Sequence, residues 1–372
     1  MRLLRTSTAL RARVALRSRG VVLVDRFGEL TAAELLDQVR LLGHRPGRAP
    51  HPGHARGLAT LPSTASLRQV LVTALAGDGT LDLRSSGTTG DPRTLRRGAL
   101  SPAQLTTLLD LARRIGLRPG RRVASLAPGV HGHGLLVALG ALALGAPLID
   151  LSHLPAPERV ALLHRAPPAL LTGVPVHLVD LLHADQEGAG NRPLRIPRIV
   201  SGSDLLAEPL QADLARHFHA RVHDVYGTTE TGPLAVDGRP LRGVRLRERD
   251  GLLRARTSFT RGRTLITDRG RIGPDGGIEV TGRADGAVSS GGMLHDPGAV
   301  AHLLRIQPGI TAVQLRVVHD PRVGSRTIAE VTLAHAVTSN ASPGPEELRA
   351  LVRDRLGAAS VPREVRISSP GR

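Results

Sequence analysis

Ser85-Ser86-Gly87-Thr88-Thr89-Gly90-Asp91-Pro92-Arg93 is the stretch from which the rest of the chain can be interpreted. Four hydroxyl-bearing residues and two glycines within its first six positions give a loop with several hydrogen-bond donors. Because glycine tolerates positive φ, consecutive backbone N–H groups can turn toward one anion. Arg93 adds a fixed positive charge at the far end. The composition predicts a phosphate-binding loop, and an ordinary polar surface turn is the simpler alternative.

The residues on either side of this loop indicate which kind of phosphate loop it is. Residues 80–84 alternate as a strand does, and residues 94–97 form a second short run that ends at Gly98. A Walker A loop needs Gly-Lys-Ser/Thr followed directly by a helix, whereas this chain contains no lysine. We therefore expect a loop between two short strands and not the fold of a P-loop NTPase.

The length and composition allow a large buried core. The chain has 372 residues, of which 41% are hydrophobic, so one large and one small domain are expected. The absence of cysteine excludes disulfides, thiolate metal sites and cysteine nucleophiles. The longest uncharged apolar run, residues 134–149, is short and glycine-rich for a membrane span, and we expect a buried helix there. A cytoplasmic protein without a membrane span is expected.

The net charge of +18 raises the hypothesis of a nucleic-acid partner. All 50 basic residues are arginine, and they are spread along the whole chain. Only three phenylalanines and one tyrosine are present, which leaves no platform on which single-stranded bases could stack. We therefore expect no specific nucleic-acid partner, while a polyanion-binding basic protein stays open as an alternative.

Strand-like and helix-like runs alternate through the first half of the chain. Residues 21–24 and 147–151 have the pattern of buried strands, and Thr31 with Glu34 forms a capping box at the start of a helix. Ser101 and the proline after it are typical of another helix start. The apolar face of that second helix is predicted to contain Leu105, Leu108, Leu109, Ala112 and Ile115. This alternation favours a layered α/β core.

Residues 224–232 form a second concentration of polar groups. They combine Tyr226, the only tyrosine, with several threonines and with Glu230. An aromatic face, hydroxyl donors and a carboxylate suit a nucleobase, a phosphate and Mg²⁺, although a plain turn is the alternative. His131 and His133, within a predicted turn, have the spacing of two metal ligands, but no third ligand accompanies them at a recognisable distance.

The pattern changes in the last third of the chain. Short alternating runs separated by glycine turns, between residues 244 and 281, predict a small β unit. Helix-like and strand-like runs follow from residue 297 to residue 367 and suffice for a small α+β domain. We therefore predict a first domain of residues 1–282 and a C-terminal domain of residues 283–372.

Taken in order, these motifs resemble the adenylate-forming acyl-activating superfamily, which includes acyl-CoA synthetases, luciferases and peptide-synthetase adenylation domains. Residues 85–93 resemble its phosphate loop, with arginine where that family usually has lysine. Residues 128–134 resemble its acyl-pocket segment and place His131 at the acyl-pocket histidine. Residues 226–230 match its Tyr-Gly-x-Thr-Glu motif closely. The short chain looks most like the compact o-succinylbenzoate–CoA ligases.

The resemblance implies a fold, a reaction and a set of site residues. The fold is a large layered α/β N-terminal domain with a small β unit, followed by a small mobile α+β C-terminal domain. Asp285 corresponds to the hinge about which that small domain rotates between half-reactions. The nucleotide is expected to contact Ser85, Ser86, Gly87, Thr88, Thr89, Gly90, Arg93, Gly202, Ser203, Asp204, Tyr226, Gly227, Asp268 and Arg283.

The reaction implied by the resemblance has two halves. A carboxylic acid attacks the α-phosphate of ATP, and the thiol of coenzyme A or of a carrier protein then attacks the acyl adenylate. In this scheme Tyr226 packs on adenine and Asp268 accepts from the ribose hydroxyls. Thr229 contacts the α-phosphate, and Glu230 ligates Mg²⁺. Positioning and charge neutralisation supply most of the catalysis.

One feature of the family is missing. The family has a catalytic lysine near the C-terminus, and here the nearest match to it is Arg372. A planar guanidinium keeps the charge but does not reproduce a compact ammonium. Three interpretations therefore stay open: an active acid–thiol ligase with impaired adenylation, a degenerate relative that binds nucleotide or acyl adenylate without efficient adenylation, and a polyanion-binding protein.

Overall fold

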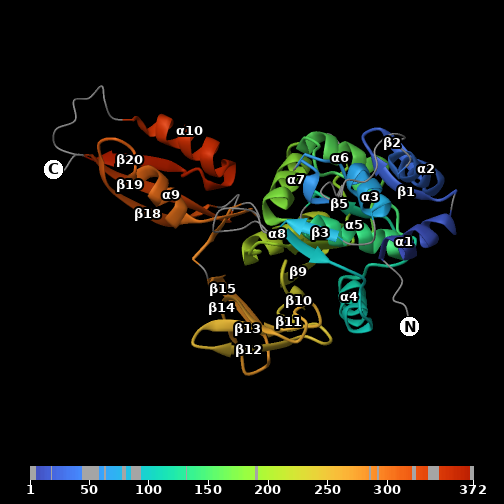
Figure 1. Ribbon diagram of the computed structural model, residues 1–372. Helices are drawn as coiled ribbons and strands as arrows, with labels where there is room; N and C mark the ends of the chain where they lie inside the picture. Colours follow the sequence, from blue (N-terminus) through green and yellow to red (C-terminus); the bar gives the residue numbers. More distant parts are fainter. Residues whose placement is uncertain are drawn as a thin grey trace. The chain divides into compact units, whose positions relative to one another are not determined.

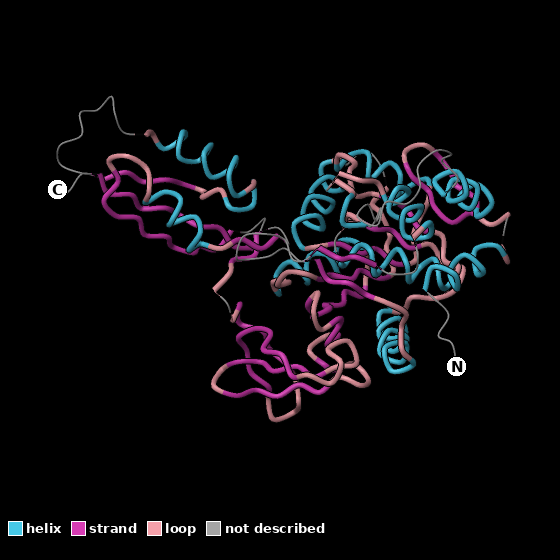
Figure 2. Tube along the Cα trace, viewed as in Figure 1, coloured by secondary structure: helices cyan, strands magenta, loops and turns pink. Residues whose placement is uncertain are grey.

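The chain folds into two compact units in the computed structural model (Figures 1 and 2). The first unit contains the described residues up to Val280, and the second contains those from Thr281 onward. The structure describes residues 6–17, 19–43, 58–62, 64–77, 81–84, 94–130, 132–188, 192–284, 286–290, 293–320, 324–333 and 343–368.

A nine-stranded sheet forms the centre of the first unit, with the strand order β11-β10-β9-β8-β7-β5-β6-β1-β2. The six strands from β9 to β1 in this order run parallel, whereas β2, β10 and β11 pair antiparallel at the two edges. The strands are β1 (Val21–Asp25), β2 (Gly28–Thr31), β5 (Val123–Ser125), β6 (Leu148–Asp150), β7 (Leu170–Gly173), β8 (Arg198–Gly202), β9 (Arg221–Thr228), β10 (Gly232–Val236) and β11 (Arg239–Pro240).

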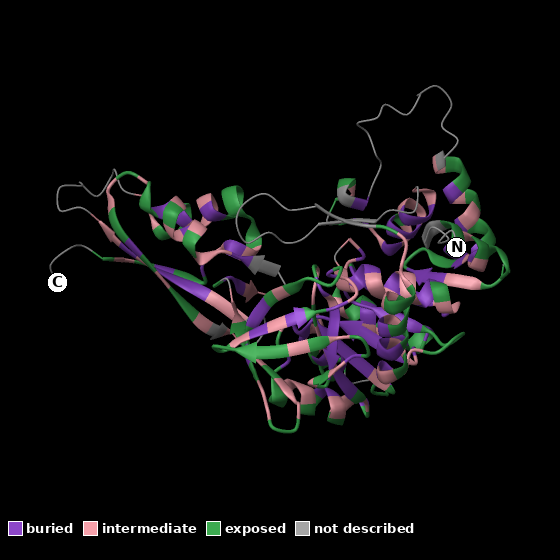
Figure 3. Ribbon diagram, turned by 60° about the horizontal axis from the view of Figure 1, so that its bottom comes forward, coloured by how far each residue is buried: buried purple, intermediate pink, exposed green. Residues whose placement is uncertain are grey.

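Helices cover both faces of this sheet because neighbouring residues of the parallel strands point to opposite faces. Val123 and Leu148 belong to one apolar cluster, and Ala124 and Ile149 belong to the other. Figure 3 shows this buried centre in purple. The first cluster packs against α1 (Thr6–Ala15), α2 (Ala32–Gly43), α3 (Leu67–Ala76), α4 (Pro102–Ile115) and α5 (Gly132–Leu144). The second packs against α6 (Ala156–Arg165), α7 (Pro175–Glu187) and α8 (Glu208–Phe218).

Two smaller sheets complete the first unit, beside the short 3-10 helix η1 (Leu58–Thr60). The hairpin of β3 (Leu81–Arg84) and β4 (Thr94–Arg97) flanks the predicted phosphate loop, and Arg84 pairs with Thr94. The expected arrangement of a loop between two short strands is therefore confirmed at its two ends. The predicted small β unit is also present, as a sheet of β12 (Arg245–Arg249), β13 (Leu252–Arg256), β14 (Thr264–Ile272) and β15 (Ile278–Arg283).

The second unit is a small α+β fold with its own core. Val300, Val331 and Val352 are fully buried in an apolar cluster that joins two helices to a five-stranded sheet. Its elements are β16 (Val288–Ser290), β17 (Met293–His295), α9 (Pro297–Arg305), β18 (Ile310–Asp320), β19 (Gly324–Leu333), α10 (Pro345–Leu356), η2 (Ala358–Ser360) and β20 (Glu364–Ser368).

The prediction for α4 was correct in position and wrong in orientation. Ser101 caps the helix and forms a capping box with Gln104, as expected. However, the buried residues of α4 are Thr107, Asp110, Leu111 and Ile115, whereas Leu105 and Leu109 are exposed. Asp110 accepts from the backbone N–H of Arg242 and forms an ion pair with Arg114, so a polar contact with the 239–243 segment sets the orientation of the helix.

The predicted helix after residue 134 begins earlier than expected. The segment from Gly132 to Gly134, predicted as a turn, forms the first turn of α5. This helix extends only to Leu144, and none of the described helices has the length and apolar character needed to cross a membrane.

Candidate functional site

The carboxyl ends of neighbouring parallel strands form the place where several predicted site residues meet. In parallel α/β sheets, loops at these ends commonly build binding sites. Gly202 is the last residue of β8. Tyr226 and Gly227 lie near the carboxyl end of β9, just before Thr228. The first turn of α5 lies beside them, because a Cβ placed on Gly132 would be 3.9 Å from Thr229 Oγ1.

Tyr226 links the large sheet to the four-stranded sheet. Its hydroxyl lies 2.7 Å from Asp268 Oδ2 and 2.8 Å from Thr267 Oγ1. The tyrosine hydroxyl donates to the Asp268 carboxylate, which only accepts, and to Thr267, whose own hydroxyl donates to the carbonyl oxygen of Leu253. Asp268 is 4% exposed. Two motifs that are 42 residues apart in the chain, the predicted adenine-packing tyrosine and the predicted ribose-binding aspartate, are therefore in direct contact.

The turn after Tyr226 is held by threonine hydroxyls. Thr228 Oγ1 lies 3.0 Å from Thr231 Oγ1, and the backbone N–H of Thr231 donates to Thr228 Oγ1. Thr257, which follows β13, donates to the carbonyl oxygen of Thr231 at 2.9 Å. Between these anchors Thr229 is half-buried and Glu230 is exposed. A carboxylate presented to solvent by a fixed turn suits Mg²⁺, which usually takes one or two carboxylates together with substrate phosphates.

Gly202 leaves room for a histidine ring at the end of β8. A Cβ on Gly202 would lie 2.9 Å from His133 Nδ1, so any larger residue would displace that ring. His133 Nε2 is 2.6 Å from Thr172 Oγ1 at the end of β7. The sequence singled out His133 as half of a metal-ligand pair, but its Nε2 atom is engaged by a hydroxyl here. Its role at this site was missed because the segment was expected to be a turn.

Burial and the neighbouring His177 lower the pKa of His133 to about 4. Since its ordinary value is near 6.5, the ring is neutral at physiological pH. A neutral imidazole held by Thr172 offers one further hydrogen-bonding nitrogen and an apolar ring face beside Gly202. This polarity suits an acyl group of partly apolar character.

Asp224 is a second residue whose importance the sequence did not single out. It lies two residues before Tyr226 on β9 and therefore on the same face of the strand. Burial, followed by the nearby Asp237, raises the pKa of Asp224 to about 6. Asp237 is held in place by His223, whose Nδ1 lies 2.8 Å from Asp237 Oδ2. The half-buried carboxylate of Asp224 is a suitable acceptor for an exocyclic amine of a base that packs on Tyr226.

The other predicted site residues fall into two groups. Ser203 lies just past β8 with φ +70°, Asp204 accepts from the backbone N–H of Leu205, and Arg283 is the half-buried last residue of β15. The remaining predicted residues lie outside the described part of the chain; these are Ser85, Ser86, Gly87, Thr88, Thr89, Gly90, Arg93, His131, Asp285 and Arg372.

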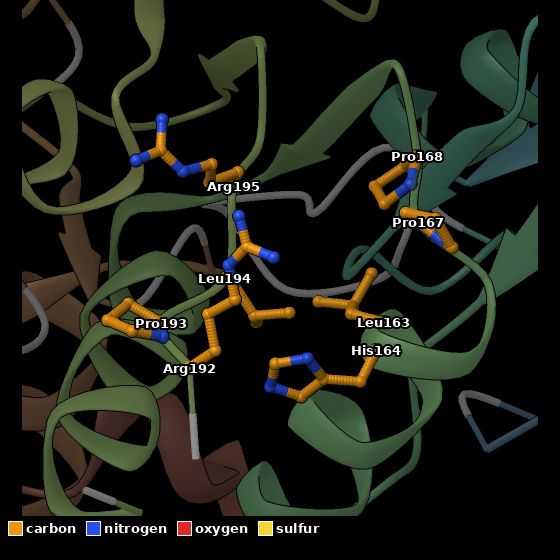
Figure 4. Close-up of a pocket in the computed structure, with 8 residues that line it drawn as sticks. All are labelled: Leu163, His164, Pro167, Pro168, Arg192, Pro193, Leu194 and Arg195. Carbon is orange, nitrogen blue, oxygen red and sulfur yellow. The ribbon is translucent and has the colours of Figure 1, made fainter.

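A shallow pocket of about 290 Å³ lies elsewhere in the first unit (Figure 4). Its lining includes Leu163, His164, Arg192 and Arg195. These residues precede β7 and β8, so the pocket lies at the amino ends of the strands. Gly202 and Tyr226 lie at the opposite, carboxyl ends. It contains none of the predicted site residues.

Comparisons with known proteins agree with the motifs. The AMP-binding enzyme family matches residues 83–251. The chain is 29% identical over 321 residues to a protein named "Probable 2-succinylbenzoate–CoA ligase" from Mycobacterium tuberculosis, covering 78% of this chain and 79% of that protein.

The fold is shared with solved structures. An amide bond synthetase from Marinactinospora thermotolerans gives a TM-score of 0.75 at 20% identity, covering 96% of this chain and 95% of the other. An o-succinylbenzoate CoA synthetase from Bacillus subtilis gives a TM-score of 0.73 at 17% identity, covering 97% and 94%. The mixed α/β fold and the resemblance to compact adenylate-forming acyl-activating enzymes are therefore confirmed.

Proposed function

We propose that this chain, a compact relative of the adenylate-forming acyl-activating enzymes, is an AMP-forming acid–thiol ligase. It would use ATP and Mg²⁺ to activate a carboxylic acid and would transfer the acyl group to the thiol of coenzyme A. The observation that carries the proposal is the contact between Tyr226 and Asp268. It joins the two side chains that this chemistry requires for the base and the ribose of one nucleoside.

The residues around this contact fit a nucleotide. The tyrosine ring gives a flat apolar face, Asp268 and Asp224 are acceptors for hydroxyl and amino groups, and Gly227 keeps the strand bare of side-chain atoms. Glu230 would hold Mg²⁺ together with the phosphates, and the metal would neutralise charge on them. Thr229 would donate its hydroxyl to the α-phosphate, whose negative charge grows as the acid oxygen attacks.

The bond changes in the proposed reaction are simple. An oxygen of the acid forms a bond to the α-phosphorus, and the bond from that phosphorus to the pyrophosphate oxygen breaks. The thiol sulfur then bonds to the acyl carbon and AMP leaves, while the thiol proton passes to solvent. The chain supplies orientation and fixed charges for both steps, and no residue of the enzyme becomes covalently modified.

The acyl group is proposed to lie beside the first turn of α5. His133 and Gly132 belong to that turn, and a Cβ placed on Gly132 would be 3.9 Å from Thr229 Oγ1. The related ligase from M. tuberculosis is named for 2-succinylbenzoate, an aromatic dicarboxylic acid. An aromatic acid is therefore the first substrate class to test, since the neutral imidazole of His133 offers a flat apolar contact.

The absence of lysine favours a second candidate function. The 372 residues contain no lysine, so none of them corresponds in kind to the lysine with which the family bridges the substrate carboxylate and the phosphate. The degenerate-relative interpretation therefore predicts that nucleotide or acyl adenylate binds while adenylation is inefficient. We propose Arg372 as the substitute. It would place a planar guanidinium where the family has the compact ammonium of a lysine.

Exchange of labelled pyrophosphate into ATP, measured with a panel of aromatic and aliphatic acids, separates the two candidates. The ligase proposal predicts acid-dependent exchange that requires Mg²⁺ and disappears in Glu230→Ala. Glu208→Ala, at the start of α8, is the matched control and should retain exchange. Saturable ATP binding without exchange for any acid would support the degenerate relative, and the absence of saturable ATP binding would reject both.

A further inference from the structure

The four-stranded sheet carries a row of arginines on its exposed face. In β12 the exposed residues Arg245 and Arg247 alternate with Leu246, so both arginines point to the same side of the sheet. The register places Arg256 opposite Arg245 and Arg254 opposite Arg247. Arg254 and Arg256 belong to β13. The alternate residues of this strand, Leu253 and Ala255, are fully buried on the other side of the sheet.

These arginines are not neutralised by any carboxylate among the described residues. Within the part of the chain that the structure describes, the guanidinium groups of Arg245, Arg247, Arg254 and Arg256 have no ion-pair partner. Arg269, the exposed residue of β14 that pairs with Leu252, has none there either. The next arginines outward do have partners, since Arg249 pairs with Asp250 and Arg271 with Glu279. We call Arg245, Arg247, Arg254, Arg256 and Arg269 together the arginine face.

The arrangement places like charges opposite one another in the sheet. Arg245 faces Arg256 and Arg247 faces Arg254, and like charges directly opposite in a sheet repel each other. Neighbouring strands are about 4.8 Å apart and alternate residues about 7 Å apart, distances within the Debye length of about 8 Å. Charged edge strands can simply prevent aggregation. However, Arg254 and Arg256 belong to an inner strand, and protection of a sheet edge from aggregation does not require charges on an inner strand.

Apolar residues lie among these charges. Ile266 is 50% exposed and lies opposite Arg254 on β14. Leu252, partly exposed, lies between Arg249 and Arg269 in the register. Arginine is enriched in protein interfaces, and the exposed aliphatic side chains among these arginines add apolar area that a partner would bury. A single-stranded nucleic acid would need aromatic stacking residues, and the described residues of this face include none.

The arginine face is separate from the proposed nucleotide site. Thr267 and Asp268, which contact Tyr226, are buried. On the other side of the same sheet, four of the five arginines are exposed and Arg254 is half-buried. Five positive charges on a flat sheet face also exceed what one small anion neutralises. From this geometry we infer that the arginine face is a docking surface for a second protein that presents carboxylates around an aliphatic contact.

Charge reversal on the edge strand tests the inference. The probe is a fluorescently labelled helical peptide rich in glutamate, with leucine at every fourth position, and its binding is measured by anisotropy at physiological ionic strength. The double variant Arg245→Glu/Arg247→Glu is compared with Arg118→Glu/Arg121→Glu, two exposed arginines in the loop before β5 with the same change in charge. We expect about a tenfold or greater loss of affinity for the first variant and less than about threefold for the second.

Three further measurements decide the interpretation. Thermal unfolding of Arg245→Glu/Arg247→Glu should occur at an equal or higher temperature, because repulsive cross-strand pairs become attractive, so lost binding cannot be attributed to unfolding. AMP release with coenzyme A should be unchanged in that variant, which keeps this test independent of the proposed reaction. Equal losses of peptide binding in both variants would overturn the inference. The inference would also be overturned if duplex DNA binding depended on Arg245 and Arg247 while peptide binding did not.

Discussion

Removing the Tyr226 hydroxyl tests the junction on which the nucleotide site is built. Tyr226→Phe keeps the ring and deletes a donor that lies 2.7 Å from Asp268 Oδ2 and 2.8 Å from Thr267 Oγ1. A hydrogen bond to a charged group contributes about 1.5–3 kcal/mol net, and the neighbouring Thr267 loses a donor as well. Because Thr267 also lies 3.3 Å from the carbonyl oxygen of Leu253, its hydroxyl retains a partner. We therefore expect a loss of about 2 kcal/mol in the free energy of unfolding.

The assay is urea denaturation followed by far-UV circular dichroism, with thermal unfolding as a second readout. A loss of about 2 kcal/mol corresponds to a fall of about 4–8 °C in melting temperature for a unit of this size. Asp268→Asn and the double variant complete a double-mutant cycle. We expect a coupling energy of about 1–2 kcal/mol between the two side chains, since their atoms are in direct contact.

A control separates this junction from hydroxyl loss in general. Thr106→Val removes a hydroxyl that only bonds the preceding turn of α4, and it should cost less than about 0.5 kcal/mol. A coupling energy near zero between Tyr226 and Asp268 would refute the reasoning, because the two strands would then not depend on this contact.

Three other perturbations have expected outcomes. Asp224→Asn should raise the free energy of unfolding at pH 7.5 by about 1–3 kcal/mol. The pKa of Asp224 is about 6 in the folded protein and 3.8 in the unfolded chain, so the ionised carboxylate destabilises the folded protein above about pH 6. Near pH 4 this penalty is absent, and the stabilisation by Asp224→Asn should vanish in denaturation measured there. His133→Ala should raise the KM for the acid about tenfold or more and leave the KM for ATP unchanged, as steady-state kinetics would reveal. Gly202→Ala should weaken acid binding in the same assay, because its methyl group would meet His133 Nδ1 at 2.9 Å, and a wild-type KM would contradict this.

Local patterns in the sequence predicted much of the fold. The capping box of Thr31 and Glu34 is present, with the Thr31 N–H donating to Glu34 Oε2 at 2.8 Å. Helices α9 and α10 lie within residues 297–367, where helix-like and strand-like runs were expected. These features depend on residues close together in the chain, so the sequence contains the information needed to predict them.

Features that depend on distant residues were less predictable. The orientation of α4 is set by the contacts of Asp110 with the 239–243 segment, more than a hundred residues away. Helical periodicity indicates which residues share a face, but it does not indicate which face meets the sheet when polar residues have distant partners. The position of His133 against Gly202 and Thr172 likewise arises from two strands and a helix that meet only in the folded chain.

The candidate site was predicted as a set of motifs and not as a geometry. Tyr226 and Asp268 were each assigned to the nucleotide from resemblance, and their direct contact arises where β14 of the four-stranded sheet approaches β9 of the large sheet. The arginine face was not predicted, because alternating arginines in a strand do not reveal whether carboxylates lie opposite them. Only the pairing of β12 with β13 shows that arginine faces arginine.

Calorimetric titration of ATP with Mg²⁺ into the wild-type protein and into Asp268→Ala tests the central claim most directly. If Tyr226 and Asp268 hold the nucleoside, the wild-type protein should bind one nucleotide saturably, AMP should compete, and the variant should lose at least about tenfold in affinity while unfolding as a single cooperative unit. Unchanged nucleotide affinity in a folded Asp268→Ala protein would contradict the account.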